Sequence, residues 1–292
     1  MKHRTLGKAG LSVSAIGLSL THTSRGGLPF QDKRGMSALI HRAVEMGENF
    51  FDTSELYDMH GDERLAGEAL EPFRDEVVIA AKFDWRIGAR CGRDGGLSAM
   101  RRSLEDSLRR LRTDRIDLYY QDGVDPDVPI EDVAQTVSEL KKEGKVLHWG
   151  LSHAGVCDIR RAHAICPVTA VRGEYSLWVR RPESDLLPAL EETGIGFVSS
   201  NPIGMGFLAD SPEDTRLSES SNPARNHMDE LRAFAAAREI TPSQVALAWL
   251  LCQKPWIVPV PGTKKEEHLQ EYMSAAYVEL SAADMIELNA ML

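Results

Sequence analysis

The sequence predicts an α/β protein of the (β/α)8 TIM barrel class, with a β-hairpin before the barrel and additional helices at its C-terminal end. Short apolar runs alternate with amphipathic stretches through most of the 292 residues, which indicates parallel strands joined by helices. Eight such strand–helix units can be counted, the number that closes one barrel. No Gly-x-Gly-x-x-Gly pattern follows the first strand, where residues 17–20 read GLSL. An open, doubly wound sheet is therefore the weaker alternative.

The elements of the first half follow from local patterns. Two strand-like runs at 3–6 and 11–14 flank a glycine-containing turn and predict the hairpin. Beyond it, apolar residues at helical spacing indicate the helices, and glycine indicates where they end. We expect barrel strands at 15–18, 49–51, 76–81 and 115–121, and helices at 35–46, 63–70, 97–111 and 130–143.

The second half continues the alternation. We expect strands at 146–151, 168–171, 196–199 and 256–260, and helices at 156–165, 184–193, 224–238 and 242–252. The last of these helices starts with the residues TPSQ at 241–244, a capping box with proline at the first helical position. Two further helices close the chain. No break in composition marks a linker, so residues 1–292 are predicted to form a single domain.

Composition restricts the partners and the compartment. Apolar residues make up 42% of the chain, enough for a full core, and no stretch reads as a membrane span. The net charge of -10 and the pI of about 5.4 argue against nucleic acid and anionic membrane surfaces as partners. The N-terminal residues do not read as a secretory signal, and the four cysteines form no Cys-x-x-Cys pair. We therefore expect a cytoplasmic protein with a small-molecule substrate, and the sequence does not indicate an oligomeric state.

A carboxylate and a phenol follow the second predicted barrel strand. Phe50 and Phe51 are followed by Asp52, Tyr57 lies in the next loop, and Lys82 ends the third strand. Polar side chains at the carboxyl ends of parallel strands meet at one mouth of a barrel, where enzymes of this fold carry out their chemistry. No histidine stands at a metal-ligand spacing from a cysteine or glutamate. The sequence thus predicts a site without a metal ion.

Six blocks of the sequence resemble the aldo-keto reductase family, in the order in which that family carries them. The block at 50–57 reads FFDTSELY, and the last block, at 257–264, reads IVPVPGTK. The resemblance spans nearly the whole chain and implies a barrel whose lower end is plugged by the N-terminal hairpin. It also implies transfer of a hydride from NADPH to a carbonyl group. The remaining blocks are 77–83, 102–111, 143–152 and 173–178.

In that family four polar residues form the catalytic site, and three of them have counterparts here. Tyr57 corresponds to the general acid that protonates the nascent alkoxide. A free phenol has a pKa of about 10 and needs a neighbouring cation to act as an acid at neutral pH. Lys82 corresponds to that cation, and Asp52 to the carboxylate that holds the lysine in place.

The fourth residue departs from the family pattern, because Asp122 stands where the family has a histidine. A neutral imidazole can donate a hydrogen bond to a carbonyl group, whereas an ionised carboxylate repels the negative charge that develops there. Two alternatives remain open from the sequence. Asp122 is protonated by burial and donates a hydrogen bond itself, or it competes with Tyr57 for Lys82.

Further departures cluster where the family binds the nicotinamide ring. Ser152 is followed by His153 instead of asparagine, Arg172 replaces a glutamine, and Ser200 lies where a stacking aromatic residue is expected. Ser152 and His153 are adjacent, an arrangement that seldom makes a catalytic Ser–His pair. The residues expected to bind the phosphate of NADP(H) match the family pattern more closely. Backbone amides and lysines are suited to bind a phosphate group. Its expected residues are Gly262, Thr263, Lys264, Lys265, His268 and Glu271.

The expected function is that of an NADP-dependent oxidoreductase that reduces a carbonyl group, or a conjugated double bond, of a small organic substrate. Two alternatives share the fold. One is a lyase, dehydratase or isomerase that uses Tyr57, Lys82 and Asp122 for proton transfer without net redox chemistry. The other is a non-catalytic regulatory or binding subunit. Binding of NADPH separates the first hypothesis from the other two.

Overall fold

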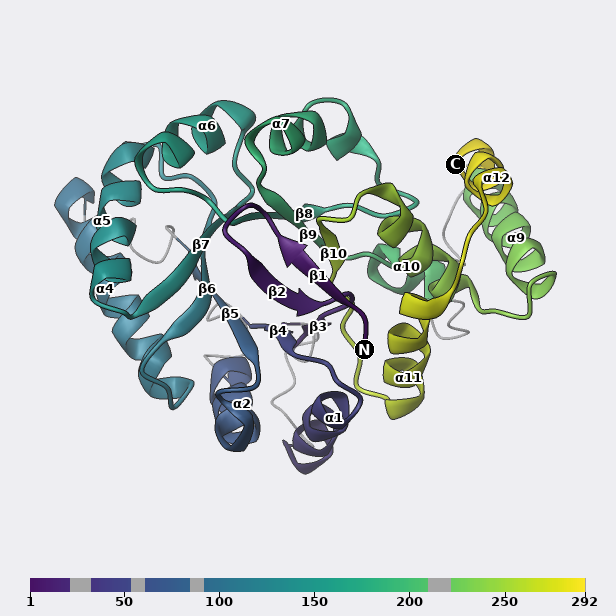
Figure 1. Ribbon diagram of the computed structural model, residues 1–292, viewed down its shortest axis with the longest axis horizontal. Helices are drawn as coiled ribbons and strands as arrows, with labels where there is room; N and C mark the ends of the chain where they lie inside the picture. Colours follow the sequence, from purple (N-terminus) through teal and green to yellow (C-terminus); the bar gives the residue numbers. More distant parts are fainter. Residues whose placement is uncertain (22–32, 54–60, 85–91, 210–221, 292) are drawn as a thin grey trace.

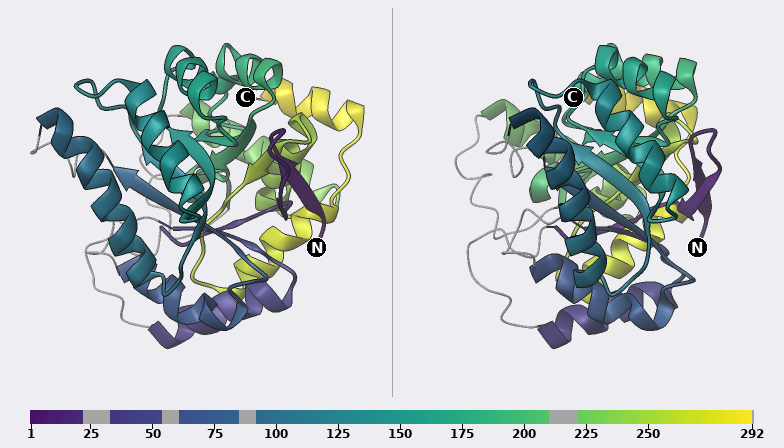
Figure 2. Two further views of the ribbon diagram at one scale, coloured as in Figure 1. Left: turned by 60° about the vertical axis from the view of Figure 1, so that its left-hand side comes forward. Right: turned by 90° about the vertical axis from the view of Figure 1, so that its left-hand side faces the viewer.

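In the described part of the chain, eight parallel strands and their helices form a (β/α)8 barrel, with an antiparallel hairpin across one end (Figures 1 and 2). The computed structural model describes residues 1–21, 33–53, 61–84, 92–209 and 222–291. The barrel strands pair in chain order, so the predicted fold class is confirmed. They are β3 (Leu18–Ser19), β4 (Phe50–Asp52), β5 (Val78–Asp84), β6 (Ile116–Asp122), β7 (Val146–Ser152), β8 (Ala170–Glu174), β9 (Gly196–Ser200) and β10 (Ile257–Pro259).

Two backbone hydrogen bonds close the barrel between its first and last strands. Gly17 N donates to Pro259 O over 2.9 Å, and Ser19 N donates to Pro261 O over 2.9 Å. Glycine is required at this seam, because a Cβ on Gly17 would come within 2.6 Å of the Phe50 ring. The sheet thus closes on itself, as a barrel requires.

Helices surround the barrel on the outside (Figure 1). Those between strands are α1 (Lys33–Glu45), α2 (Gly61–Leu70), α4 (Gly92–Arg110), α5 (Ile130–Lys142), α6 (Val156–Ile165), α7 (Leu186–Thr193), α9 (Asn222–Ala236) and α10 (Pro242–Gln253). After the last strand follow α11 (Glu266–Ser274) and α12 (Ala282–Met291), and α12 packs beside α9. Short 3-10 helices are η2 (Glu71–Phe73), η4 (Arg181–Glu183), η5 (Gly204–Ala209) and η6 (Ala275–Tyr277). The predicted capping box at the start of α10 is confirmed, since Thr241 and Gln244 exchange both hydrogen bonds.

The N-terminal hairpin closes the lower end of the barrel. It consists of β1 (His3–Leu6) and β2 (Leu11–Ser14), as predicted. The Arg4 guanidinium donates to the carbonyl groups of Leu251, Lys254 and Ile257, at the end of α10 and the start of β10. Lys8 N donates to Gly194 O, just before β9. These contacts lie at the N-terminal ends of the strands, so the C-terminal mouth is left for chemistry.

Alternation along the strands decides which side chains reach that mouth. The interior of the barrel is filled by Leu6, Leu11, Val13, Phe50, Ala80, Leu118, Tyr120, Ala170, Val198, Val258 and Val260. A larger apolar layer packs between the strands and the helices. Successive side chains point to opposite faces of a strand, so the residue two positions after an inward residue also points inward. The residues two positions after Phe50, Ala80, Tyr120, Ala170 and Val198 are Asp52, Lys82, Asp122, Arg172 and Ser200. The apolar pattern therefore brings these polar side chains to one mouth.

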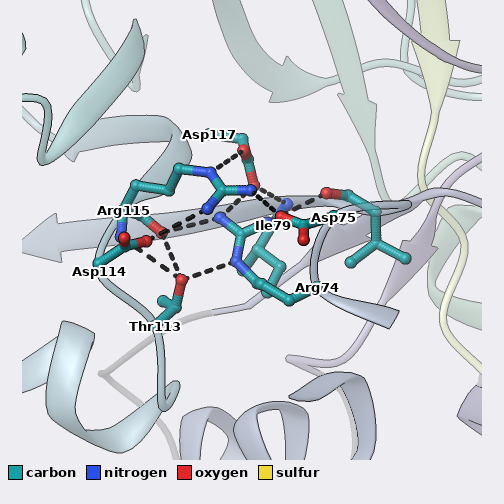
Figure 3. A network of polar contacts seen from close by, with 8 residues as sticks. Arg74, Asp75, Ile79, Thr113, Asp114, Arg115 and Asp117 are labelled. Carbon is teal, nitrogen blue, oxygen red and sulfur yellow. Dashed lines mark hydrogen bonds and ion pairs between the residues drawn. The ribbon is translucent and has the colours of Figure 1, made fainter. Parts of the chain in front are cut away.

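A polar network holds the lower end of the sheet together (Figure 3). Arg74 Nη2 lies 2.8 Å from Asp117 Oδ2, and the same oxygen accepts from Ile79 N over 2.8 Å. Arg74 also donates to Thr113 Oγ1 and to Arg115 O. Burial raises the pKa of Asp117, although the Arg74 charge opposes this. The network joins the segments that lead into β5 and β6, far from the mouth.

Several predicted boundaries differ from the structure; the first barrel strand, expected at 15–18, is Leu18–Ser19, and the third, expected at 76–81, is Val78–Asp84. Helix α4 begins at Gly92, earlier than the predicted 97; Gly96 lies inside it, where a Cβ would come within 3.1 Å of Val128. Strand β8 begins and ends later than predicted, because it pairs with β7 up to the partners Ser152 and Arg172. Arg172 is thus an inward strand residue and not the first residue of a loop.

Within the described ranges, none of the helices combines the length and apolarity needed to cross a membrane.

Candidate active site

Asp52 and Lys82 form a buried ion pair at the C-terminal mouth. Lys82 Nζ lies 2.7 Å from Asp52 Oδ1 and also donates to Thr53 O. The Asp52 side chain is 0% exposed and that of Lys82 is 2% exposed, so both charges are removed from water. Strands β4 and β5 are neighbours, and Lys82 is the inward residue that follows Ala80, the partner of Asp52. The structure therefore brings these two candidate residues together.

Arg172 is a second cation on the same carboxylate. Its Nε donates to Asp52 Oδ2 over 3.1 Å, and its side chain is 10% exposed. Burial acts to raise the pKa of Asp52, but the charges of Arg172 and Lys82 outweigh it and hold this pKa below its ordinary value. Burial lowers the pKa of Lys82 to about 8; Arg172 contributes to the lowering, and Asp52 opposes it. Lys82 is thus a cation whose charge depends on Asp52.

Asp122 and His153 form a second close polar contact at the mouth. His153 Nδ1 lies 2.7 Å from Asp122 Oδ1. The carboxylate is 10% exposed, whereas the imidazole is 65% exposed. Asp122 ends β6 and is the register partner of Ser152 on β7, so His153 follows directly beside it. His153 has a φ of 54°, a left-handed conformation that few non-glycine residues adopt and in which histidine is enriched.

Ser152 and His153 do not form a catalytic pair of the serine-hydrolase type. Ser152 Oγ lies 3.1 Å from His153 Nδ1, the nitrogen that also faces Asp122. A catalytic triad needs the serine and the carboxylate on opposite ring nitrogens. In this protein both groups share one nitrogen, so the imidazole cannot take a proton from Ser152 while Asp122 orients it.

The surroundings of Asp122 favour its ionised form. Burial acts to raise the pKa of this carboxyl, but the hydrogen bond and the charge of His153 outweigh burial and lower the pKa to about 2. The protonated alternative drawn from the sequence does not fit these contacts. The Asp122 charge also acts on Lys82, whose pKa it raises, while its direct partner is His153.

The expected phosphate-binding residues lie at the start of α11, after β10. Thr263 Oγ1 accepts from Lys265 N over 3.1 Å and orders the turn before the helix. The side chains of Lys264 and Lys265 are exposed. His268 lies one turn into the helix, and the Glu271 carboxylate accepts from Thr241 Oγ1. Two lysines and the free amides of a helix N-terminus suit a phosphate group.

Comparison with known proteins identifies the family. The aldo/keto reductase family model matches residues 15–292. The chain belongs to this family. A probable aldo-keto reductase 1 of Glycine max is 37% identical over 302 residues, covering 97% of this chain and 86% of the relative.

Solved aldo-keto reductases have the same fold. A thermostable member in complex with the inhibitor epalrestat matches with a TM-score of 0.84 and 28% identity, covering 100% of both chains. An aldo/keto reductase from Klebsiella pneumoniae in complex with NADP and acetate matches with a TM-score of 0.82 and 25% identity, covering 99% of this chain and 95% of the other. A Klebsiella pneumoniae aldo-keto reductase in complex with NADPH matches with a TM-score of 0.81 and 26% identity, covering 100% of this chain and 95% of the other.

Asp122 and Arg172 bring opposite charges to the mouth. Asp122 adds a negative charge where a histidine is expected, and Arg172 adds a positive charge where a glutamine is expected. Asp52, Lys82, Asp122 and Arg172 each lie within contact distance of an oppositely charged or hydrogen-bonding partner at the mouth. Buried charges are tolerated when they are paired in this way.

Two further residues bear on the mouth. Tyr57, the candidate acid, lies outside the described residues. Asp84 was missed by the sequence reasoning. It ends β5, is 1% exposed and is the register partner of Asp122. The signal was its spacing, because Asp84 follows the inward Lys82 by two positions.

Other features of the described structure lie apart from this site. A cavity of about 990 Å³ is lined by the hairpin residues Lys2, Arg4 and Lys8 and by Trp256, at the lower end of the barrel. Ser200 ends β9 and is 5% exposed at the mouth. Among the described residues, no group of three or more histidine, cysteine, aspartate or glutamate side chains is placed to hold a metal ion.

Proposed function

We propose that this protein is an NADP(H)-dependent oxidoreductase that reduces a carbonyl group, or a conjugated double bond, of a small organic substrate. The observation that carries the proposal is the buried Asp52–Lys82 ion pair at the C-terminal mouth of a barrel of this family. A cation held at such a position by a carboxylate can lower the pKa of a neighbouring acid. Tyr57 follows Asp52 closely in the chain and is the acid that we assign to it.

Each residue has a separate task in this mechanism. When bound, NADPH would supply the hydride that reduces the carbonyl carbon and would be left as NADP⁺. The carbonyl π electrons then move to the oxygen, which takes the phenolic proton of Tyr57 and forms the alcohol. Lys82 stabilises the tyrosinate that remains, until the phenol recovers a proton from water. Asp52 keeps Lys82 charged and in place, since burial alone lowers the pKa of Lys82.

The residues at both ends of the cofactor site support NADP(H). Lys264, Lys265 and the amides at the start of α11 would hold the adenosine 2′-phosphate, which favours NADP over NAD. Gly262, Thr263, His268 and Glu271 would surround the adenosine. Ser152, Arg172 and Ser200 lie at or near the C-terminal ends of β7, β8 and β9, which would face the nicotinamide, and His153 follows Ser152 directly. Two of the solved relatives contain NADP or NADPH.

Titration with NADPH, followed by cofactor fluorescence, tests the cofactor assignment. We expect saturable binding that is tighter than the binding of NADH. Exchanging both Lys264 and Lys265 for alanine should raise the Kd of NADPH by about tenfold or more, because charge-assisted contacts worth about 1.5–3 kcal/mol are lost. The Kd of NADH should stay nearly unchanged. Lys142→Ala, an exposed lysine on α5, is the matched control. Absence of saturable NADPH binding by the unmodified protein would overturn the proposal.

The Asp122–His153 pair favours one second candidate, an enzyme that moves protons without net redox chemistry. A carboxylate that orients an imidazole makes a general base, as in other Asp–His pairs. This candidate predicts turnover that needs Tyr57 and Lys82 but consumes no NADPH. Measuring NADPH oxidation together with product formation therefore separates the two functions.

A further inference from the structure

The imidazole of His153 is held by one nitrogen and open at the other. Its Nδ1 contacts Asp122 Oδ1 at 2.7 Å and Ser152 Oγ at 3.1 Å. Among the residues that the structure describes, Nε2 has no hydrogen-bond partner. The ring is 65% exposed and its carboxylate partner is 10% exposed. The buried carboxylate thus anchors the inner edge of a ring whose outer edge is available to a ligand.

This arrangement decides what Nε2 can do. A carboxylate only accepts hydrogen bonds, so the Nδ1 that faces Asp122 carries the proton. In the imidazolium form, Nε2 then also carries a proton and donates. In the neutral form, Nε2 has a lone pair and accepts. His153 is therefore equipped to exchange a proton, or a hydrogen bond, with a group at the mouth.

A charged His153 would also neutralise the negative charge of Asp122. A bare carboxylate at the end of β6 would repel negative charge on a substrate oxygen. With His153 charged, the pair is neutral overall and presents an N–H in place of the carboxylate. His153 has a left-handed backbone with a φ of 54°, and its ring contacts Asp122 at the end of the neighbouring strand β6. A strained conformation of this kind persists where the surroundings enforce it.

We propose that His153 is a catalytic residue whose Nε2 contacts the reacting oxygen of the substrate, and that Asp122 is its positioning residue. The inference rests on the proposed carbonyl reduction. As the carbonyl oxygen gains the electron pair, the Nε2–H of His153 donates a hydrogen bond to it, and the proton that completes the alcohol comes from Tyr57. The imidazole enters the mouth from β7, next to the β6 position that Asp122 occupies.

Chemical rescue tests this role directly. With 4-nitrobenzaldehyde and NADPH as probes, His153→Ala should lower kcat/KM by about 10²-fold, the usual cost of losing a positioned donor, with the Kd of NADPH unchanged. Because the ring is exposed, imidazole added to the solution should restore at least about a tenth of the lost rate. In Asp122→Ala/His153→Ala, rescue should fail, since the free imidazole has no anchor. His3→Ala, an exposed histidine of the hairpin, is the matched control.

An NMR measurement without cofactor checks the geometry separately. In ¹⁵N-labelled protein, the imidazole Nδ1–H of His153 should give a resonance protected from exchange, and Asp122→Ala should abolish it. Activity of His153→Ala equal to that of the unmodified protein would overturn the inference and leave the proposed function intact. So would an increase in the Kd of NADPH as large as the loss of kcat/KM, which would make His153 a cofactor-binding residue. If the unmodified protein neither binds NADPH nor reduces the aldehyde, the proposed function fails together with the catalytic role, and the resonance still reports whether Asp122 holds the ring.

Discussion

Asp52 is the residue on which the charges of the mouth depend, because both Lys82 and Arg172 contact its carboxylate. Lys82→Met is therefore an informative change. It removes the cation assigned to Tyr57 but leaves Asp52 paired with Arg172, so the buried carboxylate keeps a partner. We expect the rate of aldehyde reduction to fall by about 10²–10⁴-fold with little change in thermal unfolding. A rate close to that of the unmodified protein would show that Lys82 is structural only.

Asp122 and Arg172 carry opposite charges at the mouth, and a double-mutant cycle tests whether these two charges are energetically coupled. Asp122→His removes one negative charge from the mouth, and Arg172→Gln removes one positive charge. Each single change leaves an imbalance among buried groups, whereas the double change restores balance. In urea unfolding, we expect the double variant to be more stable than the sum of the single effects by about 0.5–3 kcal/mol. Strict additivity would show that the charges of Asp122 and Arg172 are not coupled.

Only part of the candidate site could be predicted from the sequence. Asp52, Lys82 and Asp122 were located by strand ends and by family blocks, because alternation along a strand is local information. The contact of Arg172 with Asp52 joins residues 120 positions apart, and the shared nitrogen of His153 depends on a side-chain rotamer. Neither is encoded in a local pattern. Asp84 was within reach of the same alternation and was overlooked.

At the scale of elements, the joint between the hairpin and the barrel contains a buried acid. Glu48, just before β4, is 1% exposed, and its Oε1 accepts from Ser14 Oγ of β2 and from Phe50 N. Oε2 has no hydrogen-bond partner among the described residues. Burial raises the pKa of Glu48 from 4.5 to about 8. The folded protein therefore keeps this carboxyl protonated at pH values where the unfolded chain has lost the proton.

The pKa of Glu48 predicts how stability depends on pH. Between about pH 4.5 and pH 8 the folded state binds the extra proton, so the free energy of unfolding falls as pH rises. The stabilisation is complete below pH 4.5 and lost as pH passes 8, a decline of up to about 5 kcal/mol for this single group. Glu48→Gln keeps the acceptor oxygen and should flatten this slope in urea unfolding at a series of pH values. Glu279→Gln, an exposed acid, is the control; equal slopes in all three proteins would contradict the assignment.

Element boundaries were predicted less well than element types, for reasons visible in the structure. All the barrel strands were expected because their apolar runs are bounded by turn signals. Helix α4 starts at Gly92 and includes Gly96, although glycine is a poor helix former; a Cβ on Gly96 would come within 3.1 Å of Val128. The bounds of β8 follow its pairing with β7 over Ala170–Arg172 and with β9 over Ala170–Glu174. Tertiary contacts, which no local pattern contains, decided both.

In the whole molecule, the contacts that hold the fold together and the candidate site lie in different parts of the barrel. The hairpin, the Arg74–Asp117 network and the closing bonds of Gly17 and Ser19 lie below or along the strands. The paired charges of Asp52, Lys82, Asp122 and Arg172 gather at the other end. That division lets the mouth hold unfavourable buried charges while the rest of the molecule supplies the stability. The single-domain organisation of residues 1–292 and the cytoplasmic location stay predictions.

The most direct test of the central claim compares the unmodified protein with Tyr57→Phe in NADPH oxidation by an aldehyde. We expect the unmodified protein to form one alcohol for each NADPH consumed. Tyr57→Phe should bind NADPH with the same Kd and lose at least about 10²-fold in rate, because the acid is gone and the cofactor site is intact. NADPH oxidation no faster in the unmodified protein than in Tyr57→Phe would contradict the account of this mouth as a carbonyl-reducing site.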